Sequence, residues 1–559
     1  FRVRAYRNAA RTIDGLTRSL TEMVEEGEDL TRLSDVGEDI SGYITELVQT
    51  GRLELLQKIK EEVPGTLARL LELDGVGPKT AQQLYEELDI TSVEELEEAL
   101  EEGEVQELEG LGEKKAEKME RSIEVYREHR QRFKLGDADQ LVRPLKEYME
   151  DAPGIQELEV TGSYRRRRET VGDIDLLAVC DDPGPLMDHF TSFEAVDRVA
   201  EAGDTRGTVI LRSGLQVDIR ILPERSYGAA LHYFTGSKDH NVAIRKRGVE
   251  QGLRISEYGV FEVPGEKDAE EMDPEEGERI GGAREEEVYD AVGLPWIAPE
   301  LREGRGEIEA AEEDRLPELL TLDDIRGDLQ LHTTWSDGEE EIAAMAEACR
   351  ERGYDYLAVT DHSQRVSVAQ GLDEQGVEEQ WEAIEEAQDR VDGIRILKGM
   401  EVDILEDGSL DLDDEHLEGL DLVLVSVHSY MDLDRSEQTD RIITAISHPA
   451  VHILGHPTGR IINEREPYEV DMEEVLQAAA EHDVALEINA NPDRLDLTDT
   501  HVYRARQVGV RISIGTDAHA ARELRFMSYG VDQARRGWLE TGDVINTWPL
   551  DELVDRLEG

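Results

Sequence analysis

The 559-residue chain has little cysteine and no long apolar run. Its two cysteines, Cys180 and Cys349, lie far apart, which argues against a disulfide framework or a cysteine zinc site and indicates a reducing, cytoplasmic compartment. No apolar stretch approaches the roughly 20 residues that cross a bilayer, so we expect no membrane partner. The chain begins at Phe1 instead of methionine, and we therefore expect natural residues to precede it.

Basic residues are also scarce. The chain has 61 Lys and Arg against 130 Asp and Glu, which gives a net charge of −69 and would repel a polyanion such as DNA. One interpretation is a disordered or calcium-buffering protein, but 38% hydrophobic residues and clear periodic segments argue against it. The acids occur in every segment, which favours adaptation to very high salt, as in a haloarchaeon, where self-repulsion is screened. Binding of DNA would then depend on specific phosphate contacts.

The length allows three or more domains, and changes of pattern along the chain predict their boundaries. Helical patterns fill the first 130 residues, strands follow at 158–161 and 173–179, and a hairpin is expected over 208–222. Short apolar strands alternate with helices after residue 330, which predicts a parallel α/β barrel or sheet. The expected domains are two helical regions at 1–60 and 61–134, α+β regions at 135–223 and 224–299, a linker rich in Glu, Gly and Arg at 300–323, and the barrel at 324–559.

Three glycine turns of one form occur at 33–37, 73–79 and 108–115. In each, apolar residues pin a tight turn, a glycine allows close backbone approach, and a helix follows, so that backbone N–H groups face a phosphate. A single copy fits an ordinary helix–turn–helix connection equally well. Three copies favour helix-hairpin-helix units that bind gapped or nicked DNA without reading its sequence. The residues expected to contact DNA are Val36, Gly37, Gly75, Gly77, Lys79, Gly110, Gly112 and Lys114.

Three aspartates on predicted strands could form a metal site. Asp173 and Asp175 lie two residues apart and so face the same side of one strand, and Asp218 lies on a strand that could pair beside them. An isolated Asp-x-Asp is more often a solvated strand edge, but carboxylates within apolar strands need a cation to offset desolvation. Three carboxylates suit Mg²⁺, and two such ions would activate a 3′-hydroxyl and stabilise a leaving pyrophosphate.

These aspartates follow Gly162-Ser163 and four arginines at 165–168, and the stretch resembles the palm of family X DNA polymerases, the DNA polymerase beta group. Tyr233-Phe-Thr-Gly-Ser237, Asn241, Arg245 and Glu257-Tyr258 extend the resemblance over residues 1–299. It implies an N-terminal 8-kDa-like domain, fingers, palm and thumb. It also implies catalysis by Asp173, Asp175 and Asp218 with two Mg²⁺, and binding of a dNTP by Gly162, Ser163, Arg166, Gly172, Arg220, Tyr233, Phe234, Gly236, Asn241 and Arg245.

One position departs from that family. Relatives that remove 5′-deoxyribose phosphate use a lysine on the helix after the first hairpin, and this sequence has Tyr43 there, with Asp39 one turn earlier. Because a Schiff base needs an amine, we predict that this lyase activity is absent or relocated. A robust borohydride-trapped adduct would contradict that prediction.

Ten of the fourteen histidines lie after residue 330, and most follow a predicted strand. Side chains at the C-terminal ends of barrel strands converge on one face, and mixed imidazole and carboxylate ligands suit Zn²⁺, Mn²⁺ or Fe²⁺. A single histidine is more often a surface or capping residue, which is the expectation for His416, His448, His452, His482 and His501.

The placement of the other histidines resembles the PHP (polymerase and histidinol phosphatase) domain, a seven-stranded β/α barrel with a site for up to three metals, over residues 324–559. The resemblance implies the ligands His332, Asp337, His362, Glu401, His428, His456, Asp517 and His519. Gln330 stands where the family usually has another histidine, and since an amide is a poorer ligand, one metal would bind weakly or differently. Bridging metals would generate a hydroxide that attacks phosphorus.

Three hypotheses follow. The leading one is a monomeric repair polymerase that fills short DNA gaps, as in base excision repair, and whose PHP domain acts as a 3′–5′ exonuclease or processes 3′ ends or abasic sites. The second is a phosphatase of small phosphate esters with a DNA-binding tether, although a tether needs no Asp173–Asp175–Asp218 site. The third is a non-catalytic DNA-binding scaffold, which would require both metal centres to be decaying.

Overall fold

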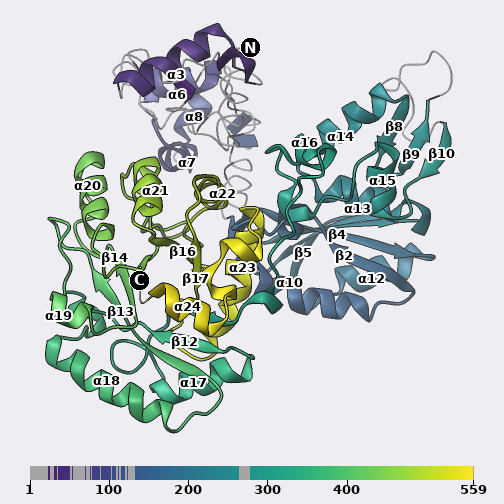
Figure 1. Ribbon diagram of the computed structural model, residues 1–559. Coiled ribbons are helices and arrows are strands. Elements are labelled where there is room, and N and C mark those ends of the chain that lie inside the picture. The colour runs from purple at the N-terminus through teal and green to yellow at the C-terminus, as the bar shows by residue number, and fades with distance from the viewer. Residues whose placement is uncertain are drawn as a thin grey trace. The chain divides into compact units, whose positions relative to one another are not determined.

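The computed structural model describes residues 23–24, 30–33, 36–50, 53, 70, 73, 76, 78–88, 90–101, 103–108, 111–112, 115–116, 118–119, 123, 132–263 and 277–557 (Figure 1). Two compact units interleave along the sequence: the first holds residues 1–133, 171–176 and 182–220, and the second holds 134–170, 177–181 and 221–559. Within the described ranges no helix is long and apolar enough to cross a membrane.

Short helices make up the described part of the N-terminal region. They are η1 (Leu30–Arg32), α3 (Glu38–Thr50), α6 (Pro78–Leu88), α7 (Val93–Glu101) and α8 (Glu104–Glu107). The three predicted glycine turns share one hydrogen bond, in which the backbone N–H of Val36, Val76 and Leu111 donates to the carbonyl three residues earlier at 3.2, 3.1 and 3.1 Å. The side chains of these three residues are apolar and buried, so each turn is anchored to the core by an apolar residue, as its sequence predicts.

The palm region is a five-stranded sheet with the order β2-β4-β7-β6-β5. Its strands are β2 (Ile155–Val160), β4 (Asp173–Cys180), β5 (Val196–Ala202), β6 (Arg206–Leu211) and β7 (Gln216–Leu222). The helices of this region are α10 (Leu135–Glu150), α11 (Gly162–Arg165) and α12 (Pro183–Thr191), and β1 (Phe133–Lys134) pairs with β3 (Thr170–Val171). The hairpin of β6 and β7 is antiparallel and turns through Gly214 at φ +87°, a conformation that glycine adopts without strain.

The thumb region combines helices with a small sheet of order β10-β9-β8. Its elements are η2 (Glu224–Ser226), α13 (Tyr227–Thr235), α14 (Lys238–Glu250), β8 (Leu253–Ser256), β9 (Gly259–Glu262), β10 (Glu278–Gly281) and α15 (Glu285–Ala291). The predicted linker 300–323 is not an open connection, because it carries η4 (Pro299–Leu301), α16 (Glu307–Glu312) and η5 (Leu322–Asp324), and Arg302 and Glu307 are buried in it. The prediction of a linker relied on composition alone, and ion pairs allow these polar residues to be buried.

The C-terminal region is a barrel of seven parallel strands in sequence order, β11 to β17. The strands are β11 (Gly327–Asp328), β12 (Tyr356–Val359), β13 (Arg395–Asp403), β14 (Leu422–Ser426), β15 (Ile453–Leu454), β16 (Ala485–Asn489) and β17 (Ile512–Gly515). A parallel bridge between Leu331 and Ala518 nearly closes it. The accompanying helices are α17 (Ile342–Glu351), α18 (Glu374–Gln388), α19 (Asp414–Leu417), α20 (Arg435–Ile446), α21 (Met472–Glu481), α22 (Asp499–Val508), α23 (Met527–Arg536) and α24 (Leu550–Leu557).

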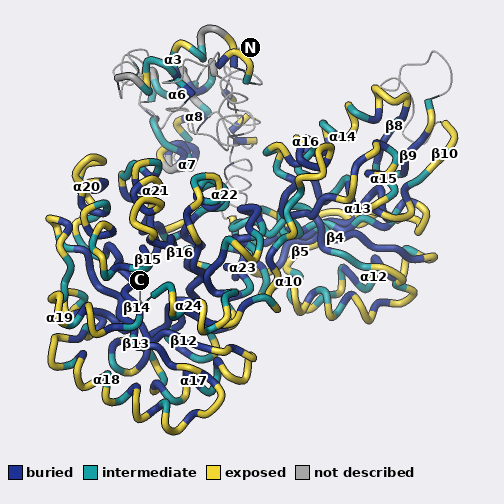
Figure 2. The backbone as a smooth tube through the Cα atoms, viewed as in Figure 1, coloured by how far each residue is buried: buried dark blue, intermediate teal, exposed yellow. Residues whose placement is uncertain are grey.

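The barrel strands are buried along almost their whole length, whereas the helices expose their outer faces (Figure 2). Strand β14, Leu-Val-Leu-Val-Ser, is buried at every position because both faces of a parallel barrel are covered. Leu424 and Leu553 belong to the core inside the barrel, to which α24 contributes, and Val423 belongs to the core between the strands and the outer helices. This packing fixes the strand ends from which the predicted metal ligands project.

Candidate metal centres

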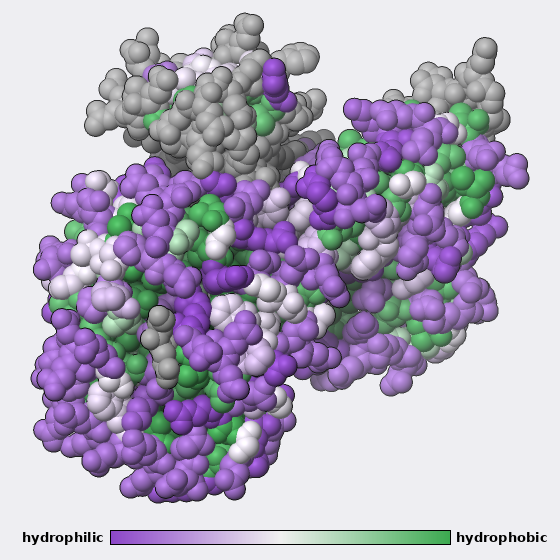
Figure 3. Space-filling view, in the orientation of Figure 1, coloured by the Kyte–Doolittle hydropathy of each residue, from purple (hydrophilic) through white to green (hydrophobic). Residues whose placement is uncertain are grey.

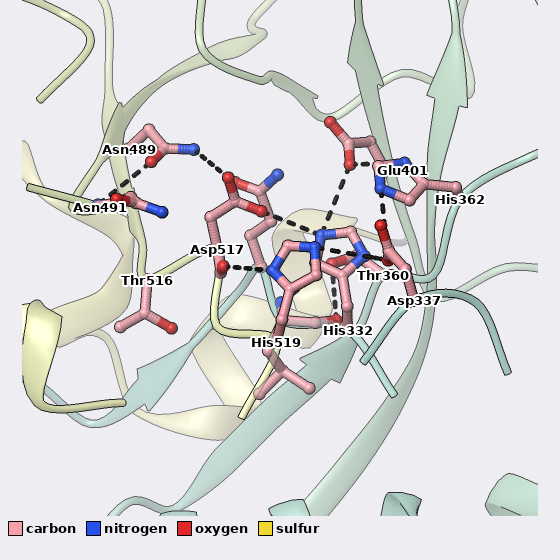
Figure 4. A network of polar contacts seen from close by, with 12 residues as sticks. His332, Asp337, Thr360, His362, Glu401, Asn489, Asn491, Thr516, Asp517 and His519 are labelled. Carbon is pink, nitrogen blue, oxygen red and sulfur yellow. Dashed lines mark hydrogen bonds and ion pairs between the residues drawn. The ribbon is translucent and has the colours of Figure 1, made fainter. Parts of the chain in front are cut away.

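The C-terminal ends of the barrel strands bring the predicted PHP ligands together. One group of donor atoms, all within 4.8 Å of one another, comes from His332, Asp337, His362 and His519, and a second from His362, Glu401 and His428. His362 belongs to both groups, so the two groups adjoin (Figure 4). Sequence spacing predicted this convergence because each residue lies at or just after a strand end.

Glu401 lies at the centre of the second group. Its carboxylate oxygens are 3.1 Å from Nδ1 of His362, 3.4 Å from Nε2 of His428 and 3.1 Å from Nε2 of His456. Asp517 takes the corresponding place in the first group, where its Oδ1 lies 3.0 Å from Nε2 of His332 (Figure 4). His456 and Asp517 therefore contact the two groups directly, although they are not members of either.

The titration of the site reflects these contacts. Burial works against charge, but the histidines around Glu401 hold the pKa of its carboxyl well below the usual range. Burial lowers the pKa of His428, yet Glu401 and Asp403 raise it to about 9. In the same way Asp337 and Asp517 offset burial and raise the pKa of His519 to about 10. Imidazoles that attract protons so strongly also attract cations, which compete with protons for the same nitrogens.

The donor set fits a metal. Buried Nδ1 atoms of His332 and His456 make no hydrogen bond to any residue that the structure describes. Such orphaned nitrogens are costly unless something coordinates them. Imidazole and carboxylate ligands together suit Zn²⁺ or Mn²⁺ better than Mg²⁺, which prefers oxygen alone.

Gln330 lies against a buried carboxyl. Its side chain is fully buried, and when its amide is turned so that the nitrogen faces Glu487, that nitrogen donates to Oε2 of Glu487 at 3.0 Å. Burial and the nearby Asp517 raise the pKa of Glu487 well above the usual range, so this carboxyl is disposed to hold a proton. At the position where the family usually has a histidine, the chain therefore has an amide–carboxyl pair.

Sequence reasoning missed the residues that orient the ligands. Asp361 accepts hydrogen bonds from the backbone N–H and the hydroxyl of Thr333, at 2.8 and 2.6 Å, and so holds the loop that carries Asp337. Asp403 accepts from the backbone N–H of His428 at 3.0 Å and lies 3.3 Å from its Nδ1. The spacing Glu401-Val-Asp403 could have revealed Asp403, because residues two apart on a strand share a face.

Further from the groups, Asn489 donates its Nδ2 hydrogen to Oδ2 of Asp517 at 3.1 Å (Figure 4). Such partners fix the orientation of a ligand and tune its basicity. Nothing in the local sequence around Asn489 indicates this contact, because it joins strand β16 to the loop after β17.

The palm aspartates also converge. Oxygens of Asp173, Asp175 and Asp218 lie within 4.8 Å of one another, on strands β4 and β7. Oδ2 of Asp218 accepts from Nε2 of Gln216 at 2.7 Å, and the hydroxyl of Thr208 donates to Oδ1. Three carboxylates at this separation repel one another unless a cation lies between them, so the donor set fits Mg²⁺.

Thr235 connects two segments that carry predicted nucleotide-binding residues, because arginines at and just after the end of α11 donate hydrogen bonds to this residue at the end of α13. Nη1 of Arg166 donates to the carbonyl of Thr235 at 2.6 Å, and Nη1 of Arg165 donates to its hydroxyl at 2.6 Å. Gly236 adopts φ +70°, and a Cβ there would lie 3.1 Å from Nη1 of Arg166, so glycine permits this close approach.

The other residues predicted to bind the nucleotide lie on helices α11, α13 and α14, in strand β7 and in the turn before β4. Asn241 donates to the carbonyl of Tyr233 at 2.7 Å, and the rings of Tyr233 and Phe234 meet edge to face at 5.2 Å between centroids. Arg245 donates to the carbonyl of Asn241 at 3.3 Å. Gly162 and Ser163 begin α11, Gly172 lies between β3 and β4, and Arg220 lies in β7.

The structure describes some of the residues in the predicted DNA-binding turns. Val36 is buried, and Gly37 and Gly112 are exposed at the turns. Gly75, Gly77, Gly110 and Lys114 lie outside the described residues, as does the side chain of Lys79.

Known families match four parts of the chain. A helix-hairpin-helix domain matches residues 1–53, a SAM-like helix-hairpin-helix tandem 67–121, the DNA polymerase beta thumb 230–303, and the PHP domain 328–491. The DNA polymerase/3′-5′ exonuclease PolX of Bacillus subtilis (strain 168) is 39% identical over 555 residues, which cover 99% of this chain and 94% of that protein. The chain belongs to the PolX family of DNA polymerases. The resemblance to family X polymerases with a PHP domain, and the predicted fold class, are thereby confirmed.

Other relatives of this PolX-family chain match shorter parts of it. A probable phosphatase of Thermoanaerobacter sp. (strain X514) is 29% identical over 236 residues, which are 39% of this chain and 90% of that protein. The probable phosphatase YcdX of Escherichia coli O139:H28 is 29% identical over 206 residues, which are 35% of this chain and 78% of that protein. The chain thus shares part of its length with proteins named as probable phosphatases.

Proposed function

We propose that the chain fills short gaps in DNA during repair and removes nucleotides from 3′ ends with its barrel. One observation carries this proposal: a group of carboxylates in the palm, and two adjoining groups of imidazoles and carboxylates in the barrel, occur in one chain. The B. subtilis relative, which is named for both activities, matches over nearly the whole length. A scaffold without catalysis would have no need of either group.

In the polymerase reaction, Asp173, Asp175 and Asp218 would hold two Mg²⁺. Such ions would activate the primer 3′-hydroxyl and offset the negative charge of the leaving pyrophosphate. Gln216 and Thr208 orient the Asp218 carboxylate through their hydrogen bonds. Ser163 and Arg166 would bind the triphosphate of the dNTP, and the turns at 33–37, 73–79 and 108–115 would bind the backbone of gapped or nicked DNA.

Primer extension across a one-nucleotide gap, in molar salt with Mg²⁺, tests the polymerase. We expect Asp218→Ala to lower the rate by about 10³-fold, which corresponds to about 4 kcal/mol of transition-state stabilisation. Asp197→Ala is the matched control, because Asp197 is an exposed residue of β5 outside the donor group. Equal rates for wild type and Asp218→Ala would refute the assignment.

In the nuclease reaction, the barrel ligands would hold Zn²⁺ or Mn²⁺. Such ions would lower the pKa of a bound water and so supply the nucleophile for hydrolysis of a phosphodiester. Asp337, His362 and Glu401 position them, and Asp361 and Asp403 orient the ligands. The same chemistry would hydrolyse phosphodiester bonds at 3′ ends and beside abasic sites.

A second candidate function is hydrolysis of small phosphate monoesters, which the probable phosphatases matching part of the chain favour. Hydrolysis of a monoester with Mn²⁺, without degradation of a single-stranded oligonucleotide, would select that function. We further propose that the protein is a monomer adapted to very high salt. We also propose that it lacks the 5′-deoxyribose phosphate lyase activity, because α3 carries Tyr43 where the lyase relatives have a lysine.

A further inference from the structure

A pocket lies among the loops that follow three neighbouring strands of the barrel. The loops that follow β12, β13 and β14 line a cavity of about 380 Å³, here named the Tyr430 pocket, whose residues are Arg365, Leu405, Glu406, Asp407, Ser409 and Tyr430. The same three strand ends carry His362, Glu401 and His428. Arg365 follows His362 by three residues and Tyr430 follows His428 by two, so both pocket residues lie on loops that also carry predicted metal ligands.

Tyr430 is an aromatic side chain presented to solvent on a constrained loop. It is 38% exposed, and its backbone adopts φ +54°, a left-handed conformation that costs a bulky residue about 1–3 kcal/mol. Buried Arg441 holds this conformation, because its Nη1 donates to the carbonyls of Ser429 at 2.9 Å and Tyr430 at 3.3 Å. Nε of Arg441 also donates to the carbonyl of Leu405 at 2.7 Å, which ties the two loops together.

Arg365 completes the pocket with a positive charge. Its Nη2 donates to the Tyr430 hydroxyl at 3.1 Å, and its guanidinium carbon lies 5.7 Å from the centroid of the ring. Its backbone N–H donates to Oδ2 of Asp411 at 2.5 Å, so the loop is also fixed. An exposed ring beside a guanidinium is the combination with which proteins bind single-stranded nucleic acid, by base stacking and phosphate contact.

The other polar residues of the pocket suit a base better than a second phosphate. Glu406 and Asp407 would repel an anion, but their oxygens can accept hydrogen bonds from the exocyclic amines of a base. Arg365 is the one cation among the residues that line the pocket, so it is the lining group that can pair with a phosphate.

We propose that the Tyr430 pocket binds the terminal nucleotide of a single DNA strand, with its base stacked on Tyr430 and a phosphate bound to Arg365. The scissile phosphate would then lie at the second donor group. This inference rests on the proposed nuclease function and supplies its substrate specificity. A small phosphate ester has no base to stack, so the pocket separates a nuclease from a small-ester phosphatase that shares the same ligands.

Two substrates and one spectroscopic probe test the pocket. With Mn²⁺, kcat/KM is measured for a short single-stranded oligonucleotide and for bis(p-nitrophenyl) phosphate, a diester without a base. We expect Tyr430→Ala to lower kcat/KM for the oligonucleotide at least tenfold more than for the small diester, mainly through KM, since stacking contributes about 1–3 kcal/mol per base. Tyr430→Phe should restore the wild-type ratio, because the ring remains.

Stacking has its own signature. A 2-aminopurine at the 3′ terminus of the oligonucleotide should be quenched on binding to the wild-type protein in EDTA and to Tyr430→Phe, but not to Tyr430→Ala. Arg365→Gln should weaken oligonucleotide binding, whereas Arg435→Gln, which removes an exposed arginine paired with Asp471 at 2.6 Å, should not.

The outcomes distinguish the two proposals. Equal losses on both substrates, or unchanged quenching in Tyr430→Ala, overturn the pocket assignment while the nuclease stands. If the wild-type protein hydrolyses the small diester but not the oligonucleotide, the nuclease function itself fails. Loss of quenching together with a changed substrate ratio supports both.

Discussion

At the residue scale, Glu303 is a buried carboxylate that meets three arginine side chains. Its Oε1 accepts from Nε of Arg166 at 3.1 Å and from Nη1 of Arg536 at 3.0 Å, and its Oε2 accepts from Nη1 of Arg168 at 3.2 Å. Burial raises the pKa of the carboxyl, but the arginines, Arg536 most strongly, more than offset it and lower the pKa to about 2. A single acid in the predicted linker thus holds the arginine expected to bind the triphosphate.

The low pKa of Glu303 gives a prediction with a defined pH window. The folded-state pKa of about 2 lies below the ordinary value of 4.5, so the ionised group stabilises the fold above about pH 4.5 and loses this contribution as the pH falls towards 2. We expect Glu303→Gln to lower the free energy of unfolding by about 3 kcal/mol at neutral pH, because three guanidinium groups lose their partner.

Urea unfolding of wild type and Glu303→Gln between pH 2 and 7 measures this effect. The difference between the two proteins should shrink below pH 4.5 and remain constant above it. Glu309→Gln, which changes an exposed acid of α16, serves as the control and should show almost no difference. A gap between wild type and Glu303→Gln that persists unchanged to pH 2 would disprove the ion-pair account.

At the element scale, helix α23 of the barrel holds the arginine loop that follows Gly162-Ser163. Oδ2 of Asp532 accepts from Nε of Arg167 at 2.7 Å, and Nη1 of Arg536 donates to the carbonyl of Arg166 at 2.6 Å. Apolar contact accompanies these bonds, because Leu135 and Tyr529 share one core cluster. The barrel helix therefore supports a loop that belongs, by family resemblance, to nucleotide binding.

A double-mutant cycle on Arg167 and Asp532 tests this support. With Arg167→Met, Asp532→Asn and the double variant, we expect a coupling free energy of about 1–3 kcal/mol that persists in molar salt, because both side chains are largely buried. The exposed pair Glu386 and Arg390 in the α18 region, at 2.9 Å, is the matched control. Its coupling should stay below about 1 kcal/mol and vanish in molar salt, and similar values for both pairs would refute the prediction.

The elements also separate what sequence can predict from what it cannot. The apolar run at 422–425 predicted strand β14, and the glycine patterns predicted tight turns with buried apolar residues, because strand periodicity and turn chemistry depend on neighbouring residues. The clustering of the predicted metal ligands could be expected because every strand end of a parallel barrel faces the same way. The pairing of Arg167 with Asp532, 365 positions later, was not, because it depends on how distant segments pack.

At the scale of the whole molecule, the palm donor group shares no residue with the two barrel donor groups. The palm group lies on β4 and β7, and the barrel groups lie on loops after β11, β12, β14 and β17 and at Glu401 in β13. Nothing in the ligand sets obliges the two reactions to proceed together.

We expect His362→Ala to abolish nuclease activity, since His362 belongs to both barrel groups, and to leave primer extension within about twofold of wild type. The measurement pairs degradation of a 3′-labelled strand with extension of a gapped primer in the same buffer. His482→Ala is a control for loss of a histidine, because its ring contacts Ser447 on the outside of the barrel. Parallel loss of extension in His362→Ala would mean that one centre depends on the other.

The net charge of −69 is a property of the whole molecule. Hydrophilic residues cover most of the barrel face seen in Figure 3, which gives the carboxylates access to counterions. The Debye length falls from about 10 Å at 0.1 M salt to about 3 Å at 1 M, so repulsion between acids one side chain apart persists in dilute buffer and is screened in molar salt. Folding concentrates these charges, and therefore low salt should destabilise the native state.

We accordingly expect the melting temperature to rise by more than 10 °C between about 0.1 M and 2 M KCl, with most of the gain below 1 M, where the Debye length changes most. Sucrose at equal osmolality is the control, because it favours compact states without screening charge. If sucrose matched KCl, general exclusion from the surface and not charge would explain the stabilisation.

The same screening should leave DNA binding with a shallow salt dependence, because few lysines or arginines release counterions, and a steep slope would instead indicate many phosphate contacts.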